Sequence, residues 1–225
     1  MKTGSTLQRL RGSIINSAGT IVFGMEDGTV SIFGLIFGVA ATTTSTKTVL
    51  IAGASGAVAA AVSMMAGAYL DAETKRDQTH ATLSAAGGSG VSLAKRLVSA
   101  GLTSEQSSAL AAAVQNDRNA TDGLLLALKG AAEAPLNPLE QALWMLLADF
   151  LAAAVPILPF VFLAIGQARI VSGVVTVALL VALGVGRAQL GQRGTFRTVA
   201  ETVSMGIGAA IAGVAISMLI DRFFS

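Results

Sequence analysis

Two adjacent acids, Glu26 and Asp27, lie within a long apolar stretch that has the length of a membrane-spanning helix. A carboxylate near the middle of a bilayer costs about 2.5 to 3.5 kcal/mol on insertion-based scales, so such residues usually persist because they bind or relay something. Two neighbouring carboxylates also resist simultaneous ionisation, so one of them can hold a proton and release it when a cation arrives. The pair therefore predicts a transporter that exchanges a metal cation for protons.

A methionine and two further acids are candidates for the same chemistry. Met64 offers a polarizable, uncharged sulfur that can contact a transition metal without trapping it, although a lone methionine more often fills a core. Asp149 precedes Pro156 in a third apolar stretch, where it could serve a proton path or hold a proline kink by hydrogen bonding. Glu201, near the start of the last stretch, could guide cations into the pathway or could simply be an acid stabilised by the dipole at the start of a helix.

The two leading acids are expected to differ in role. Adjacent residues of a helix point about 100° apart, so Glu26 and Asp27 should not face one narrow pathway unless the helix is distorted. Gly28 makes such a distortion easier. Pairing with a basic residue of another helix is the alternative, but no Lys or Arg falls inside the expected spans away from their ends. We therefore expect Asp27 to carry transport and Glu26 to tune its proton.

Five apolar stretches must position these residues, and we expect them to span the membrane at about 17–41, 48–70, 142–166, 170–187 and 198–220. Of the 225 residues, 53% are hydrophobic and only 12% charged, whereas soluble domains carry about 25% charge. The predicted fold class is all-α: a polytopic membrane protein with five transmembrane helices and a small helical cytoplasmic insertion between the second and third. The transmembrane domain would comprise 1–70 and 142–225, and the insertion 71–141.

The insertion has its own local signals. Gly101 is a plausible helix C-cap, and Thr103-Ser-Glu-Gln106 has the spacing of a capping box. Gly87-Gly-Ser-Gly90 has the composition of a flexible joint. Glu73, Asp77 and His80 share one face of the continued second helix and could hold a cation, but solvated charge is the commoner reason for such spacing.

The basic residues predict the orientation in the membrane. Of the 15 Lys and Arg residues, only Lys47, Arg169 and Arg222 would lie opposite the side of the N-terminus. Because cytoplasmic loops carry the excess of Lys and Arg, we expect a cytoplasmic N-terminus and a C-terminus on the opposite side. An integral, multi-pass protein in contact with the lipid bilayer follows, with the plasma membrane of a prokaryote as its expected location.

Other functional classes find little support. The chain has no Cys and one His, and it lacks the Gly-x-Ser-x-Gly, His-Glu-x-x-His and phosphate-loop motifs, so we do not expect an enzyme. Its basic residues are spread along loops without the clustered, aromatic-rich surface of a nucleic-acid binder, so no nucleic-acid partner is expected. We expect no permanently bound cofactor.

The order of motifs resembles that of the vacuolar iron transporter family. The resemblance is most specific in the first seventy residues and extends over almost the whole chain. Its motifs are Phe23-Gly-Met-Glu-Asp-Gly28, Gly34-Leu-Ile-Phe-Gly38, Ala52-Gly53, Ser63-Met-Met-Ala-Gly-Ala-Tyr69, Gly101-Leu102, Asn137-Pro-Leu-Glu-Gln-Ala142, a break at Val155-Pro-Ile-Leu-Pro159 and a final helix opening near Glu201.

This resemblance implies a five-helix protomer that works as a homodimer and moves a divalent metal such as Fe2+ out of the cytoplasm, in exchange for protons. It also implies that Asp27 and Met64 line the conduction path at the dimer interface. Small residues at four-residue spacing, such as Gly24 with Gly28 and Gly34 with Gly38, would suit helix association between protomers or packing within one.

Departures from the family pattern affect the choice of metal. The insertion lacks the glutamates and methionines that capture iron in the family, and two membrane acids are replaced by Asn16 and Gly56. A path with fewer carboxylates should bind a divalent ion less tightly, so the cargo could be Mn2+ as well as Fe2+. The alternative is a non-transporting membrane scaffold or sensor that keeps the transporter fold but has lost the cytoplasmic metal site.

Overall fold

The described residues of the computed structural model are 11–15, 17–86, 90–114, 116–117, 120–121, 123–124 and 137–224, and they contain helices and turns without a strand. The helices are α2 (Ala18–Thr42), α3 (Thr46–Ala86), α4 (Gly90–Ser99), α5 (Ser104–Val114), α7 (Pro138–Phe162), α8 (Ile165–Leu190) and α9 (Thr195–Phe224). Five of them, α2, α3 as far as Gln78, α7, α8 and α9, are long and apolar enough to cross a membrane. The all-α, five-span fold class is therefore confirmed.

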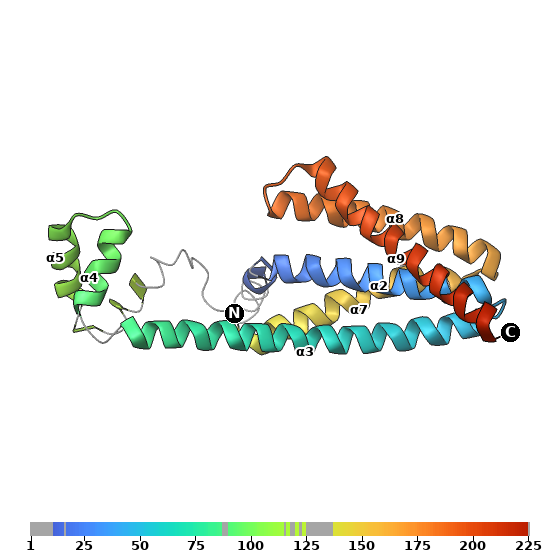
Figure 1. Ribbon diagram of the computed structural model, residues 1–225, viewed down its shortest axis with the longest axis horizontal. Coiled ribbons are helices and arrows are strands. Elements are labelled where there is room, and N and C mark those ends of the chain that lie inside the picture. The colour runs from blue at the N-terminus through green and yellow to red at the C-terminus, as the bar shows by residue number, and fades with distance from the viewer. Residues whose placement is uncertain are drawn as a thin grey trace, which may run out of the picture. The chain divides into compact units, whose positions relative to one another are not determined.

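The chain divides into two compact units. The first comprises Met1–Tyr69 and Pro138–Ser225, and the second Leu70–Asn137. The first unit holds the bundle of α2, α7, α8, α9 and the first part of α3. Figure 1 shows the start of α2 and the end of α9 at opposite ends of this bundle, as an odd number of spans requires.

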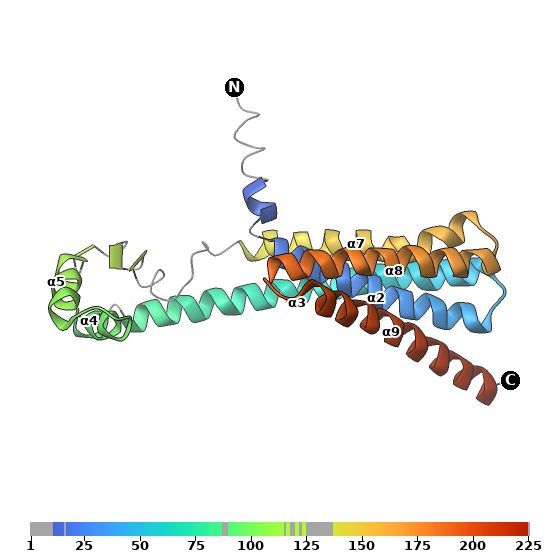
Figure 2. The ribbon, with the colours of Figure 1, turned by 90° about the horizontal axis from the view of Figure 1, so that it is seen from above.

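Helix α2 occupies the middle of the bundle (Figures 1 and 2), where it contacts α7, α8 and α9. Its buried side chains form a core with side chains of α3, α7 and α8. Helix α9 is the least buried span and diverges from the others toward its C-terminal end (Figure 2). The buried core consists of Ile32, Ile36, Ala40, Val49, Ala57, Ala153, Phe160 and Ala168.

Two expectations about the third span are wrong. The turn to the fourth span lies at 163–164, not at 167–169, because the apolar sequence on both sides gives no polar signal for it. Helix α7 also runs unbroken through Pro156 and Pro159. The buried Ser172 of α8 donates a hydrogen bond of 2.8 Å to the carbonyl of Pro156, which ties α8 to α7 beside this proline.

The small residues of α2 pack within this one chain. A Cβ atom added at Gly34 would lie 2.8 Å from the carbonyl oxygen of Ala209, and one added at Gly38 would lie 2.7 Å from that of Gly213. Helices α2 and α9 thus approach as closely as their backbones allow. Of the two roles that the spacing left open, packing within the protomer is the one the structure shows for these glycines.

The second unit contains the α4–α5 hairpin, whose buried apolar side chains are Leu93, Leu97 and Ala111. Gly101 takes a positive φ of 101°, and the amide of Leu102 bonds the carbonyl of Leu97 at 3.1 Å, so the C-cap expectation is confirmed. The capping box is confirmed as well, because Thr103 and Gln106 each bond the other's backbone amide, at 3.3 and 3.1 Å. The glycine joint falls mainly on 87–89, outside the described residues.

Candidate functional site

A cavity of about 510 Å³ lies beside α2, between it and the C-terminal end of α8, the α8–α9 turn and the N-terminal half of α9. Both Glu26 and Asp27 line it, although α2 is a regular helix over its whole length. The two acids share this site without a distortion of the helix because the cavity is wide, whereas the expectation that they point apart concerned one narrow pathway and stays a prediction. The lining consists of Gly19, Val22, Phe23, Glu26, Asp27, Val30, Arg187, Leu190, Gly191, Arg193 and Met205.

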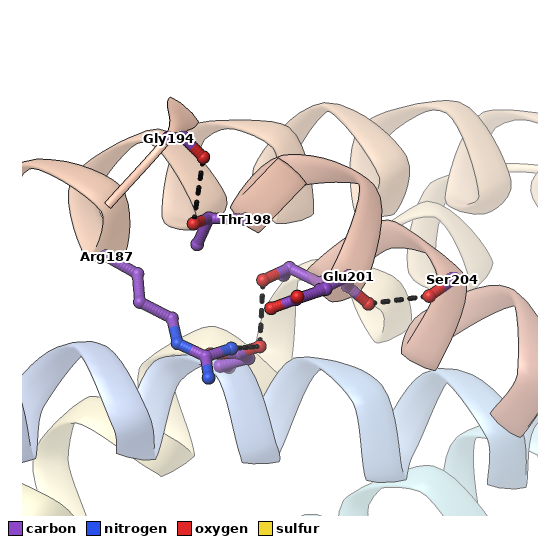
Figure 3. A network of polar contacts seen from close by, with 7 residues as sticks. Arg187, Gly194, Thr198, Glu201 and Ser204 are labelled. Atoms are coloured by element: carbon purple, nitrogen blue, oxygen red, sulfur yellow. Dashed lines mark hydrogen bonds and ion pairs between the residues drawn. The ribbon is translucent and has the colours of Figure 1, made fainter. Parts of the chain in front are cut away.

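Glu26 is bound by side chains from two other helices. Nη1 of Arg187, in α8, donates to Oε1 of Glu26 at 3.1 Å and to Oε2 at 3.4 Å. Oγ1 of Thr202, in α9, donates to the same Oε1 at 2.9 Å. Figure 3 shows Arg187 reaching from α8 down toward α2. Glu26 is thus ion-paired with a basic residue of another helix. The sequence had argued against such a pair, because no Lys or Arg falls inside the expected spans away from their ends.

The α8–α9 turn holds Arg187 at the cavity. The amide of Gly191 donates to the carbonyl of Arg187 at 2.9 Å, and the amide of Arg193 to that of Ala188 at 3.0 Å. Between them Gln192 adopts a φ of 50°, the left-handed conformation that a helix C-terminus of this kind needs. The turn therefore presents two arginines, Arg187 and Arg193, to the same cavity.

Asp27 differs from Glu26 in its surroundings. It is half-buried in the cavity wall, and no hydrogen bond or ion pair joins its carboxylate to another residue of the described part of the chain. The residue expected to lead the chemistry is therefore the one whose oxygens remain available to a ligand in the cavity.

Asp149 is buried directly against α2. Its side chain is fully shielded, and within the described chain neither of its carboxyl oxygens has a hydrogen-bond partner. A Cβ atom added at Gly28 would lie 2.9 Å from Oδ1 of Asp149, so the acid faces the glycine that follows Asp27. The structure therefore shows no hydrogen bond by which this side chain could hold the helix at its prolines.

The remaining predicted residues lie elsewhere. Met64 is half-buried on α3 and does not line the cavity, and Glu201 accepts a hydrogen bond of 3.0 Å from the exposed Arg197. Glu73 and Asp77 are exposed, and the side chain of His80 lies outside the described residues. Within the described chain, no group of three or more His, Cys, Asp and Glu residues is placed to hold a metal.

Sequence reasoning missed three residues of the site, namely Arg187, Arg193 and Thr202. Arg187 stood at the expected end of the fourth span, whereas α8 continues to Leu190 and carries it at the level of Glu26. Thr202 follows Glu201, the acid that the sequence singles out on α9, but nothing in its residue type marks it as a partner of Glu26. Met205 adds a thioether to the cavity wall.

Comparison with known proteins shows the family of the chain. A search among curated proteins finds no match. The model of the VIT family matches residues 18–218, which include all the cavity residues, four spans in full and the fifth as far as residue 218. The resemblance to vacuolar iron transporters is thereby confirmed, and the chain belongs to the VIT family of membrane metal-ion transporters.

Proposed function

We propose that this protein exports a divalent transition metal of the Fe2+ or Mn2+ class from the cytoplasm in exchange for protons. The observation that carries the proposal is the position of Asp27, a carboxylate in the wall of a bundle cavity without a bonded partner among the described residues. A buried or half-buried acid in a membrane span is kept for function more often than for structure. Its oxygens suit Mg2+, Mn2+ and Fe2+ alike.

The cavity would bind a cation weakly rather than tightly. Two acids, Glu26 and Asp27, are balanced there by Arg187 and Arg193, and Glu26 is already paired. A conduction path must bind its ion weakly enough to release it. The thioether of Met205 and water would complete the coordination of an ion held by Asp27, a set that favours transition metals over Ca2+.

We propose that the working form is a homodimer in which Met64 lines the path with Asp27. Helix α3 supports this, because its outer face carries small side chains along a shallow groove and small residues allow helices to approach closely in lipid. The groove is formed by Ala54, Ser55, Val58, Ala59 and Val62.

The proton side of the exchange is assigned to Asp149, with Glu201 in a supporting role. Asp149 faces Gly28, so it lies next to the segment that carries Asp27. The orientation we propose has the N-terminus and the unit Leu70–Asn137 in the cytoplasm, because most Lys and Arg residues then lie on that side. The plasma membrane of a prokaryote is the proposed location.

The test is transport by the purified protein in liposomes that enclose a pH-sensitive dye. Fe2+, Mn2+, Co2+, Zn2+ and Ni2+ are added in turn, with protein-free liposomes as the control for leakage. We expect saturable uptake of at least one ion, accompanied by proton movement in the opposite direction. Metal uptake without proton movement would refute the exchange. No saturable uptake of any ion would favour the non-transporting scaffold or sensor.

A further inference from the structure

The guanidinium of Arg187 occupies the place that a cargo cation would take on Glu26. Its Nη1 atom lies within 3.4 Å of both carboxylate oxygens, and both residues line the cavity that Asp27 also lines. The cavity thus contains one acid that is neutralised by a cation of the chain and one that is not. A metal ion that enters it meets a competitor already bound.

We propose that Arg187 is a tethered competitor that makes the cavity select divalent over monovalent cations. The inference rests on the proposed function of the cavity as a cation site. A monovalent ion that displaces Arg187 from Glu26 gains no more charge attraction than the guanidinium already had. A divalent ion brings a second charge, which interacts with Asp27 at the same time, so only the divalent ion gains from the exchange.

The surroundings of the pair permit the exchange. The Arg187 side chain is 36% exposed and that of Glu26 only 11%, so the guanidinium lies on the cavity side and can leave without unpacking the bundle. Arginine has a long, flexible stem, and Arg187 stands in the last turn of α8. Thr202 stays bonded to Oε1 of Glu26 and can hold the carboxylate in place after Arg187 has moved.

A purely structural role for the pair predicts different behaviour. If Arg187 only ties α8 to α2, its removal destabilises the bundle and weakens any metal site built on α2. If it competes with cargo, its removal strengthens metal binding as long as Glu26 is present. The direction of the change in affinity therefore separates the two roles.

The experiment measures Mn2+ binding to the purified full-length protein in detergent micelles, from the electron paramagnetic resonance signal of free Mn2+, with and without added K+. The variants are Arg187→Gln, Glu26→Gln and the two combined. Arg193→Gln is the matched comparison, because it removes the same charge from the same cavity but has no bond to Glu26. Circular dichroism and size-exclusion chromatography check that each variant is folded.

We expect Arg187→Gln to tighten Mn2+ binding about tenfold, the low end of the coupling between close charge pairs. Binding by this variant should also become sensitive to K+, which the wild-type protein excludes. Arg193→Gln should have a clearly smaller effect, and Arg187→Gln should have none when Glu26→Gln is already present. If Arg187→Gln does not fold, Arg187→Lys should tighten binding to a smaller degree, because the ammonium group keeps the positive charge but is more strongly hydrated than the guanidinium and competes less well for Glu26.

Unchanged or weaker Mn2+ binding in the folded Arg187 variant overturns the proposal, as does an equal effect of Arg193→Gln or the lack of measurable Mn2+ binding in every variant. The measurement does not need transport. A protein that fails to transport in liposomes but binds Mn2+ more tightly as Arg187→Gln would refute the proposed function and support the role of Arg187.

Discussion

Gly28→Ala tests the contact that places Asp27 beside Asp149. The added Cβ atom would lie 2.9 Å from Oδ1 of Asp149 and closer still to its carbonyl oxygen, whereas ordinary contacts begin at about 3.4 Å. The nearest atom belongs to the backbone of α7, so no side-chain rotation can relieve the overlap. Helices α2 and α7 must therefore shift apart by a few tenths of an ångström or more.

The size of the effect follows from two opposing terms. Overpacking of this kind costs about 1 to 3 kcal/mol, and replacing Gly with Ala inside a helix returns at most about 1 kcal/mol. Because the overlap is with backbone atoms, the upper part of the overpacking range applies, about 2 to 3 kcal/mol, and we expect a net loss of about 1 to 2 kcal/mol in the free energy of unfolding. Gly208→Ala is the matched control, because it lies inside α9 with no atom within 4 Å of the added Cβ, so it should be neutral or slightly stabilising.

The assay is reversible unfolding of both variants in mixed micelles by increasing sodium dodecyl sulfate, followed by circular dichroism. Metal uptake by the same variants in liposomes should fall for Gly28→Ala and stay unchanged for Gly208→Ala. Equal stability of the two variants would refute the close approach of α2 and α7 at Asp149. A stable Gly28→Ala protein with normal uptake would show that this contact does not matter for the path.

Two further substitutions test local features of the chain. Gln192→Gly should stabilise the first unit by about 1 kcal/mol, measured by the same unfolding assay, because a side chain in the left-handed conformation costs about 1 to 2 kcal/mol; a loss of stability would contradict the assigned turn. Leu97→Ala removes a fully buried side chain from the α4–α5 hairpin and should cost about 2 to 5 kcal/mol, which abolishes hydrogen-exchange protection in 93–111, whereas the exposed Val98→Ala should preserve it. Retained protection in Leu97→Ala would show that this side chain does not hold the hairpin together.

Features governed by local chemistry could be predicted from the sequence. The spans were visible because each needs about 20 apolar residues in succession. The capping box at Thr103 and the C-cap at Gly101 were visible because their signals lie within a few residues of each other. The sequence does not predict the turn at 163–164, since apolar residues flank it on both sides and nothing polar marks it.

The site itself depends on contacts between distant segments. Glu26 and Arg187 are separated by 161 positions, and their pairing requires α8 to continue beyond the point where its apolar stretch ends. The approach of Asp149 to Gly28 likewise depends on how closely α7 packs on α2. Asp27 could be singled out from its sequence, but the arginine that neutralises its neighbour could not.

The central claim is that Asp27 provides the carboxylate on which a divalent ion crosses the bundle. Its most direct test compares initial Mn2+ uptake by wild-type protein, Asp27→Asn and Asp71→Asn at equal amounts of folded protein in liposomes. Asp71 is the control, because it is an exposed acid of the second unit that pairs with Lys75. We predict that Asp27→Asn lowers uptake to the level of protein-free liposomes while Asp71→Asn retains it; wild-type uptake by Asp27→Asn would contradict the account.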